Sequence, residues 1–265
     1  MRIAPIASGS SGNCIYVGSN NTHILVDVGI SGKRVDEGLA SLDICGKDLD
    51  GILITHEHVD HIGGLGVICR KYSIPVYATP DTIEAIKSYK YLGKVEDDIF
   101  HPIPADVDWN IKDVTIRAFK TSHDAADPVA YTFSSEGKKI AVATDMGNFT
   151  DYTVENLMGM DSILLEANHD IRMLQVGPYP YPLKRRILSD EGHLSNEASG
   201  RLLSQILNDK MNSIFLGHLS KENNIPELAY ETVRVEIDAA DNKYRANDFK
   251  IMIAKRDTPS EVVNL

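Results

Sequence analysis

Three histidines and an aspartate stand close together in the segment 55–61, directly after the apolar run 51–54. In an extended chain, residues two apart point to the same side, so His56 and His58 are expected to face one metal ion. Asp60 and His61 follow where the chain is expected to turn, so they suit a second ion nearby. Histidines that cap or solvate a strand end would explain one or two of these residues, but not all four at this spacing. The segment therefore predicts a site for two metal ions.

The composition predicts one large folded domain. The 265 residues are 43% hydrophobic, which is enough for a full core, and we expect a single domain over residues 1–265. No apolar run approaches the roughly 20 residues that cross a bilayer, and the first residues do not form a secretion signal. The predicted location is therefore the cytoplasm, with no membrane partner. The net charge of −11 gives no general attraction to nucleic acid, so a polyanionic substrate must be held by local cations.

The cysteines indicate neither disulfides nor a thiolate metal site. Cys14, Cys45 and Cys69 are odd in number and form no Cys-x-x-Cys pair. We expect all three to be buried as small apolar residues.

Strands and helices alternate along most of the chain, which is the pattern of an α/β protein. Segment 171–192 is the least regular and is expected to lack long elements. Strands are expected at residues 2–7, 13–18, 22–28, 51–55, 75–78, 114–121, 129–134, 139–144, 161–167, 213–216 and 248–254. Helices are expected at residues 31–42, 62–72, 79–89, 153–160, 196–207 and 226–237. His123, Asp145 and His218 each follow one of these strands, so they should lie at the rim of a sheet, where loops carry function.

Together these residues resemble the metallo-β-lactamase-fold hydrolases. The resemblance rests on the pattern His56-x-His58-x-Asp60-His61 and is supported by Asp27, His123, Asp145 and His218 in the family's order. Segments 8–13, 166–170, 192–196 and 217–224 resemble the bacterial YycJ (WalJ) group, which is associated with nuclease chemistry on DNA. The fold that the resemblance implies is a four-layer αββα sandwich, of the α/β (α+β) class.

The same resemblance implies a set of ligands and a mechanism. His56, His58 and His123 would hold one ion and Asp60, His61 and His218 the other, with Asp145 bridging the two. Asp27 would accept a hydrogen bond from a ligand histidine. Two such ions lower the pKa of a shared water and supply the hydroxide that attacks a phosphodiester, so no serine or cysteine nucleophile is required. Zn²⁺ suits the nitrogen-rich first site and Mn²⁺ the carboxylates of the second, with Mg²⁺ as a further candidate.

Two residues are assigned catalytic roles. Asp60 is one of them, in addition to its place among the ligands. The other is His193, the candidate donor of a proton to the leaving alkoxide, because an imidazole titrates near neutrality. It resembles the histidine that RNA-processing enzymes of this fold use for that purpose. The alternative is that His193 only packs or positions a phosphate.

Candidates for substrate contact surround these residues. The basic run Lys184, Arg185 and Arg186 suits phosphates, and the nearby Tyr179 and Tyr181 suit unpaired bases. The alternative is a solvated basic turn beside packed tyrosines. The other candidates are Ser10 and Asn13 in a glycine-rich loop that would otherwise be an ordinary hairpin turn, His169 and Ser195.

Three functions fit the sequence. The first is a dinuclear-metal exonuclease acting on DNA ends or single strands. The second is a hydrolase of small phosphodiesters or other esters with the same metals. The third is a metal-stabilised regulatory binding protein, which the open water position at a bridging Asp145 argues against. Steep loss of DNA cleavage with salt would favour the first over the second. The oligomeric state is left open.

Overall fold

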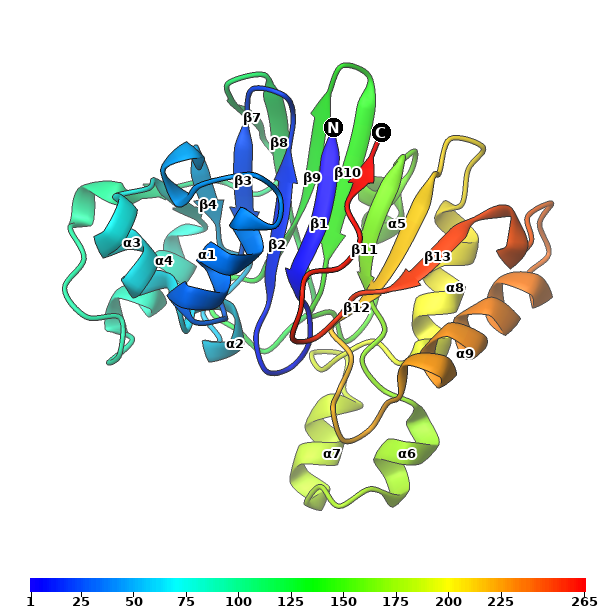
Figure 1. Cartoon of the computed structure of the whole chain (residues 1–265). Coiled ribbons are helices and arrows are strands. Elements are labelled where there is room, and N and C mark those ends of the chain that lie inside the picture. The colour runs from blue at the N-terminus through cyan, green and yellow to red at the C-terminus, as the bar shows by residue number, and fades with distance from the viewer.

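The computed structural model describes the whole chain, from Met1 to Leu265. Two seven-stranded sheets form its centre and helices cover their outer faces (Figure 1). The first sheet consists, in spatial order, of β14 (Val263–Asn264), β1 (Arg2–Ala7), β2 (Cys14–Gly18), β3 (His23–Val26), β4 (Gly51–Leu53), β5 (Val76–Ala78) and β6 (Phe100–Pro102). The second consists of β13 (Lys250–Ile253), β12 (Ser213–Gly217), β11 (Ser162–Glu166), β10 (Lys138–Ala143), β9 (Val129–Ser135), β8 (Val114–Lys120) and β7 (Asp108–Ile111). The expected αββα sandwich is confirmed.

Nine α-helices and three short 3₁₀-helices complete the fold. The α-helices are α1 (Gly32–Ala40), α2 (Val59–Ile62), α3 (Leu65–Tyr72), α4 (Pro80–Ser88), α5 (Asp151–Leu157), α6 (Ile171–Val176), α7 (Tyr181–Ile187), α8 (Asn196–Ile206) and α9 (Pro226–Ala239). The 3₁₀-helices are Gly46–Asp48, Asp97–Ile99 and Ala246–Asp248.

Alternating side chains on the strands build three separate apolar layers. Ile24 and Val26 of β3 point into the core between the two sheets, where they join residues such as Phe133 and Val142 of the second sheet. Leu25 points the other way, into the layer between the first sheet and its helices. Because successive strand residues face opposite sides, a strand buried on both faces must be apolar throughout, as this one is.

The covering helices each bury one face. Helix α8 places Leu202, Leu203 and Ile206 in the layer under the second sheet, and α1 places Val35 and Leu39 under the first. Residues three and four apart share a face of a helix. Each fully buried aliphatic side chain of this size contributes roughly 1.5–3 kcal/mol, so these faces hold the helices on the sheets.

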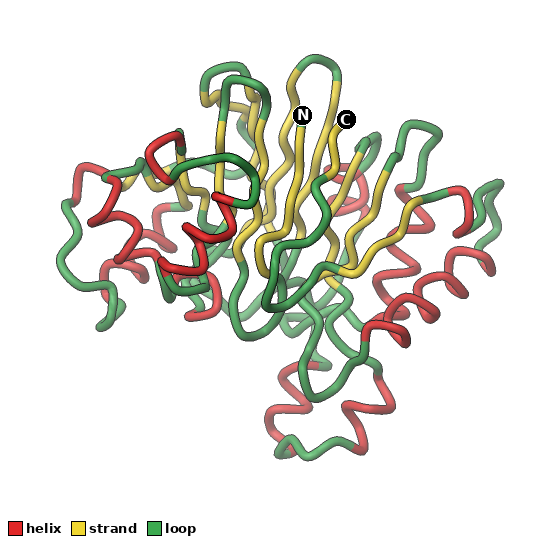
Figure 2. Tube along the Cα trace, viewed as in Figure 1, coloured by secondary structure: helices red, strands yellow, loops and turns green.

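Several strands of both sheets end at the same edge of the sandwich. Strands β10, β11 and β12 are parallel, β8 and β10 are both antiparallel to β9, and β3 is parallel to β4. Their ends therefore bring together loops that are far apart in sequence, at the lower edge in Figure 2. Helices α6 and α7 stand out from the sandwich below this edge (Figure 1).

Four expectations about local structure were wrong or incomplete. Segment 171–192 contains α6 and α7, and the expected helix 62–72 is broken at Gly64, where a Cβ would lie 1.9 Å from the carbonyl oxygen of Ile30. The short strands β6, β7 and β14 were not expected, because two to four residues carry too little alternation to detect. Cys14 and Cys69 are buried, but Cys45 is exposed.

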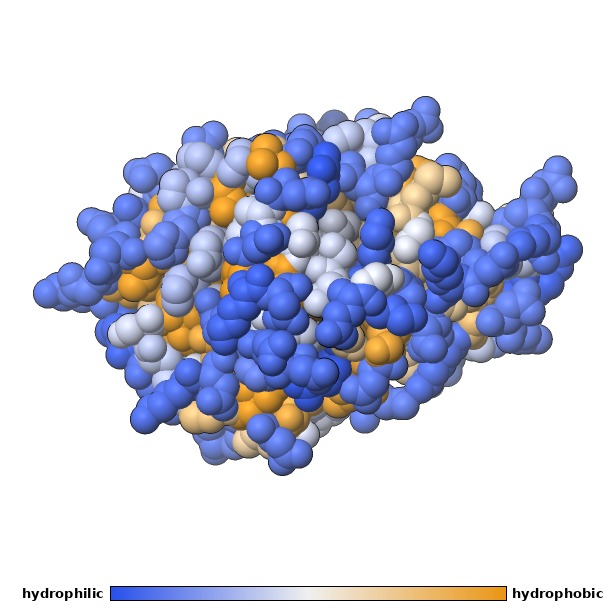
Figure 3. All heavy atoms as spheres, turned by 90° about the horizontal axis from the view of Figure 1, so that it is seen from above, coloured by the Kyte–Doolittle hydropathy of each residue, from blue (hydrophilic) through white to orange (hydrophobic).

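None of the helices combines the length and the apolar character that crossing a bilayer requires. The face seen from above is mainly hydrophilic, with apolar atoms in small separate areas (Figure 3).

Candidate metal centre

The loops at the common edge bring all seven expected metal ligands together. His56 and His58 follow β4, and Asp60 and His61 belong to α2. His123 follows β8, Asp145 follows β10 and His218 follows β12. Each of these loops follows a strand that is paired within its sheet and packed against apolar layers. The strands therefore hold the side chains on a rigid support.

The ligand atoms form four overlapping groups, and two of these match the grouping that the resemblance implies; the other two are His56, His61 and Asp145, and Asp145, Glu166, His193 and His218. Within each group they all lie within 4.8 Å of one another: His56, His58 and His123 in the first, and Asp60, His61 and His218 in the second. Nε2 of His123 is 3.2 Å from Nδ1 of His58. In the second group, Nε2 of His218 is 3.3 Å from Oδ2 of Asp60. These are the two groupings expected from the sequence.

Asp145 lies between the two groups. Its Oδ1 is 3.6 Å from Nε2 of His123, and its Oδ2 is 3.1 Å from Nε2 of His61. The carboxyl group is buried, with a side-chain exposure of 3%. One carboxylate therefore reaches both groups, which is the position that a bridging ligand requires.

The histidines of the cluster are oriented by acceptors on their other ring nitrogens. Nδ1 of His61 is 2.7 Å from Asp27, Nδ1 of His123 is 2.9 Å from the carbonyl oxygen of Gly192, and Nδ1 of His218 is 2.9 Å from Glu166. A carbonyl or carboxylate oxygen only accepts, so each Nδ1 carries a proton and each Nε2 faces the cluster, where it could bind a metal ion in place of a second proton. Asp27 thus has the contact expected of it.

The donor set fits divalent metal ions. Nε2 of His56 and Oδ2 of Asp145 are buried and have no hydrogen-bond partner within the protein. Buried polar atoms are nearly always hydrogen-bonded. Two unpaired atoms among imidazole and carboxylate groups therefore indicate that a cation binds between them. Imidazole nitrogens and carboxylate oxygens are ligands of Zn²⁺, and carboxylates also suit Mn²⁺.

The charges of the cluster compensate one another strongly. Burial opposes the charged form of His61, but Asp27, Asp145 and Asp60 together hold its pKa well above its usual value. Burial also opposes the charged form of His218, but Asp145, Asp60 and Glu166 raise its pKa to about 10. The carboxylates therefore attract positive charge, whether from protons or from metal ions.

Three cluster residues have left-handed backbone conformations. The φ angles are 61° at Asp27, 58° at Asp145 and 54° at His218. Such conformations are uncommon outside glycine and cost of order 1–3 kcal/mol each. They turn the chain sharply at the ends of β3, β10 and β12, and so aim the side chains across the edge of the sheets.

Glu166 joins the cluster to His193. Its Oε1 is 2.9 Å from Nδ1 of His218 and 2.8 Å from Nδ1 of His193. Its Oε2 accepts from the backbone N–H groups of Met146 and Leu194. Burial opposes ionisation, but His193 and His218 lower the pKa of Glu166 to about 2. The carboxylate is therefore an acceptor for both rings, and it holds His193 with Nε2 free.

Sequence reasoning assigned no contact to Glu166 or Thr55. Oγ1 of Thr55 is 2.9 Å from Asp27 and 3.0 Å from Nδ1 of His56. Both residues end a buried apolar run, as the expected ligands do. The same signal could have identified them.

The glycine-rich loop packs against the metal-binding segment through Asn13. The backbone N–H of Asn13 donates to the carbonyl oxygen of Asp60 (2.8 Å), and its Nδ2 is 3.1 Å from Nε2 of His61. Close approach depends on Gly29, where a Cβ would lie 1.6 Å from the carbonyl oxygen of Asp60. Asn13 is buried, whereas Ser10 is exposed in the turn.

The other substrate candidates differ in their surroundings. Oγ of Ser195 accepts from the backbone N–H of Ala198 and so caps α8. His169 is buried, neither ring nitrogen has a hydrogen-bond partner, and burial lowers its pKa to about 4. Of the basic run, Arg186 contacts Asp124, Lys184 contacts the carbonyl oxygen of Gln175, and Arg185 is exposed.

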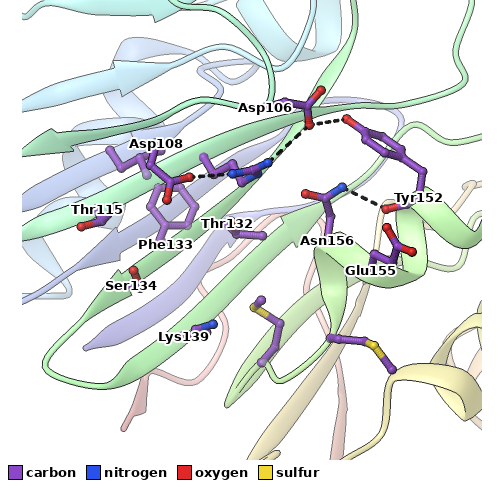
Figure 4. A pocket seen from close by; sticks show the side chains of 14 residues that line it. Asp106, Asp108, Thr115, Thr132, Phe133, Ser134, Lys139, Tyr152, Glu155 and Asn156 are labelled. Carbon is purple, nitrogen blue, oxygen red and sulfur yellow. Dashed lines mark hydrogen bonds and ion pairs between the residues drawn. The ribbon is translucent and has the colours of Figure 1, made fainter.

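A cavity of about 550 Å³ lies elsewhere, between the outer face of the second sheet and α5 (Figure 4). Its polar groups largely satisfy one another. Arg117 pairs with Asp108 (2.9 Å), and Tyr152 donates to Asp106 (2.8 Å). The cavity contains none of the expected ligands.

Comparisons with known proteins show the family to which the chain belongs. Residues 22–212 match the family model of the β-lactamase superfamily domain. The chain is 42% identical to the exodeoxyribonuclease WalJ of Streptococcus pneumoniae over 98% of its own length and 96% of that protein. It is 39% identical to the exodeoxyribonuclease YycJ of Bacillus anthracis, over 88% of each chain.

A solved structure shows the same fold. The metallo-β-lactamase fold protein YhfI of Bacillus subtilis superposes with a TM-score of 0.70 at 18% identity, over 98% of both chains. The chain thus belongs to the β-lactamase superfamily and, within it, to the family of the exodeoxyribonucleases WalJ and YycJ.

Proposed function

We propose that the protein is a metal-dependent hydrolase that removes nucleotides from DNA ends. The observation that carries the proposal is the placement of Asp145 between two groups of candidate metal ligands. The near full-length similarity to two exodeoxyribonucleases supports DNA as the substrate. Because DNA is the proposed substrate, the cytoplasm remains the proposed location.

We infer two divalent ions per chain, Zn²⁺ or Mn²⁺, with Mg²⁺ as a further candidate. His56, His58 and His123 would hold the first and Asp60, His61 and His218 the second, with Asp145 shared. When bound, such ions lower the pKa of water and stabilise the negative charge that develops on a phosphodiester.

The chain's own groups supply orientation and a proton. Asp27 and Glu166 hold the rings of His61 and His218 with Nε2 turned toward the cluster. Glu166 holds His193 in the same way, and 15% of that side chain is exposed, so its Nε2 can carry a proton to a leaving oxygen. Asp60 adds negative charge opposite Nε2 of His218.

Metal analysis of the purified protein, combined with digestion of end-labelled DNA in Zn²⁺, Mn²⁺ or Mg²⁺, tests the proposal. We expect stepwise shortening of the DNA that falls steeply as salt rises. Hydrolysis of bis-p-nitrophenyl phosphate should depend little on salt, because this substrate carries a single charge. Cleavage of the small diester without any cleavage of DNA would instead favour a small-molecule phosphodiesterase.

His58→Ala tests the metal assignment. The substitution removes one ligand of the first group, so bound metal and turnover should fall together. A metal-poor His58→Ala protein with full activity would refute the assignment. Full metal content with no activity on any substrate would instead favour a metal-stabilised binding protein.

A further inference from the structure

One cation of the basic run contacts the edge of the metal centre. Nη2 of Arg186 donates to Oδ1 of Asp124 at 2.8 Å, and Nε of Arg186 donates to the other oxygen of the same carboxylate. That Oδ1 is in turn 3.6 Å from Nε2 of His123. Nζ of Lys184 instead donates to the carbonyl oxygen of Gln175, between α6 and α7. The three basic residues are therefore not equivalent.

The chain after α7 is fastened to the loop that carries His123. The backbone N–H of Asp124 donates to the carbonyl oxygen of Glu191 (3.1 Å), and Oγ of Ser122 donates to that of Asp190 (2.6 Å). The bond from His123 to the carbonyl oxygen of Gly192 is the third such link. Arg186 is thus held at a fixed place relative to His123, although α7 stands out from the sandwich (Figure 1).

The guanidinium group still has donors to offer. It carries five N–H groups in a planar fork, and the contact with Asp124 uses two of them. The Arg186 side chain is 46% exposed, so the remaining donors can meet solvent or a ligand. A planar fork of this kind binds phosphate oxygens at two points, which an ammonium group cannot do.

We propose that Arg186, positioned by Asp124, binds a second phosphate next to the one being cleaved and so selects a polynucleotide over an isolated phosphodiester. The proposal rests on the proposed function. The metal centre would hold the scissile phosphate, while Arg186, whose charge Asp124 balances, offers its remaining N–H donors to a second phosphate at the rim. The second phosphate is either a terminal phosphomonoester or the neighbouring phosphodiester of the strand.

The experiment compares Arg186→Ala and Arg186→Lys with a matched control, Arg117→Ala. Arg117 also pairs with an aspartate, Asp108 (2.9 Å), and is 39% exposed, but it lies at the distant cavity of Figure 4. For each protein, kcat/KM is measured on a single-stranded oligonucleotide and on bis-p-nitrophenyl phosphate. The ratio of the two values reports selectivity for the polynucleotide.

Arg186→Ala should lower this ratio by about tenfold to a hundredfold, the range for losing hydrogen bonds to a charged group. Arg186→Lys should fall between, because it keeps the charge but loses the fork. Arg117→Ala should leave the ratio at its original value. An unchanged ratio in Arg186→Ala would overturn the proposal.

Binding provides a readout that does not depend on turnover. The affinity for a fluorescein-labelled oligonucleotide is measured by anisotropy in the presence of a chelator, across a range of salt. For Arg186→Ala the slope of log K against log salt should decrease by about 0.7, the value for one phosphate contact on a single strand. A slope that stays the same contradicts the proposed contact.

Three oligonucleotides distinguish the two sources of the second phosphate. They carry a 5′-phosphate, a 3′-phosphate or hydroxyl groups at both ends. If Arg186 binds a terminal phosphate, its loss weakens only one phosphorylated substrate. If it binds an internal phosphodiester, its loss weakens all three equally.

Asp124→Asn distinguishes a role in substrate binding from a purely structural role of the Arg186–Asp124 pair. An amide keeps the shape but binds the guanidinium more weakly, so Arg186 becomes mobile and KM for the oligonucleotide should rise more than kcat falls. If the Arg186–Asp124 pair only supports His123, Asp124→Asn and Arg186→Ala should both lower kcat on both substrates and lower the melting temperature. That result would overturn the proposal. If wild-type protein cleaves no DNA at all, the proposed function fails first, and the small diester still reports whether the metal centre works.

Discussion

Glu166 is a single carboxylate that orients two histidines with different tasks. Glu166→Gln keeps the shape, but the amide nitrogen cannot accept from a ring N–H or a backbone N–H. Each oxygen accepts two of the four present hydrogen bonds, so two of them must be lost or reversed, whichever oxygen the amide nitrogen replaces. We expect metal affinity to fall by about tenfold to a hundredfold, as for other residues that orient metal-bound histidines. Competition with a chromogenic chelator measures it, and unchanged affinity together with unchanged activity would contradict this role.

His193→Ala tests whether this residue donates a proton. A substrate with a good leaving group, such as p-nitrophenolate, needs little help from an acid, whereas a nucleotide alkoxide needs a proton. The variant should therefore slow DNA cleavage by about 10²–10⁴-fold and p-nitrophenyl ester cleavage much less. Equal slowing of both substrates would indicate that His193 only positions the phosphate.

The residue types at the site could be predicted, but several of their conformations could not. The candidate ligands could be named from their side-chain chemistry, from the positions of several of them after an apolar strand, and from the family resemblance. The left-handed backbone at Asp145 and His218 does not follow, because aspartate and histidine adopt it more often than most residues but still only rarely. These conformations arise from the packing of loops that are distant in sequence, which no local pattern records.

At the scale of elements, the loops around the cluster depend on close backbone contacts. A Cβ at Gly147 would lie 2.3 Å from the backbone nitrogen of Gly192 and 2.4 Å from the carbonyl carbon of Asp190. The loop after β10 therefore rests directly on the segment that joins α7 to His193. Neither backbone can yield without moving a functional side chain.

Gly147→Ala should consequently separate these two loops. We expect a loss of stability of about 1–3 kcal/mol from overpacking and a larger loss of turnover, because Asp145 and His193 shift apart. Gly137→Ala is the control: its φ of +75° makes alanine unfavourable, but nothing lies within 4 Å of the added Cβ, in the turn between β9 and β10. That variant should melt at a lower temperature and keep its activity. Normal activity in Gly147→Ala would show that the contact is not needed.

Helices α6 and α7 mark the limit of prediction for elements. Their segment contains three prolines between residues 178 and 182, which break the periodic pattern that identifies longer helices. Each helix has only six or seven residues, and short helices are stabilised by their neighbours more than by their own sequence. By contrast, α8 and α9 have long apolar faces and were predicted to within two residues at each end.

Across the whole molecule, the proposed metal ions would compete with protons for the same histidines. The pKa values of His61 and His218 are raised in the folded chain, the latter to about 10. A histidine whose pKa is raised by folding stabilises the fold fully below its pKa in the unfolded chain, which is near 6.5. This stabilisation is lost as the pH rises through the pKa in the folded chain. In a chelator, the melting temperature should therefore fall between about pH 6.5 and 10.

Metal-loaded protein should behave differently over the same range. Metal binding requires neutral imidazoles and so strengthens as the pH rises. The difference in melting temperature between loaded and chelated protein should therefore widen with pH, and groups outside the cluster titrate in both samples and cancel. Parallel curves would count against metal binding by these histidines.

Each group of candidate metal ligands draws on both sheets. In the first, His56 and His58 follow β4 of the first sheet and His123 follows β8 of the second. In the second, His61 lies in α2, which comes after β4, and His218 follows β12 of the second sheet. A bound ion would thus cross-link the two sheets at this edge of the sandwich, as a disulfide can cross-link two layers. Removing the ion should allow local opening at this edge alone. Amide hydrogen exchange should become faster in the flanking loops, and protection from exchange should stay unchanged at the far ends of the same strands.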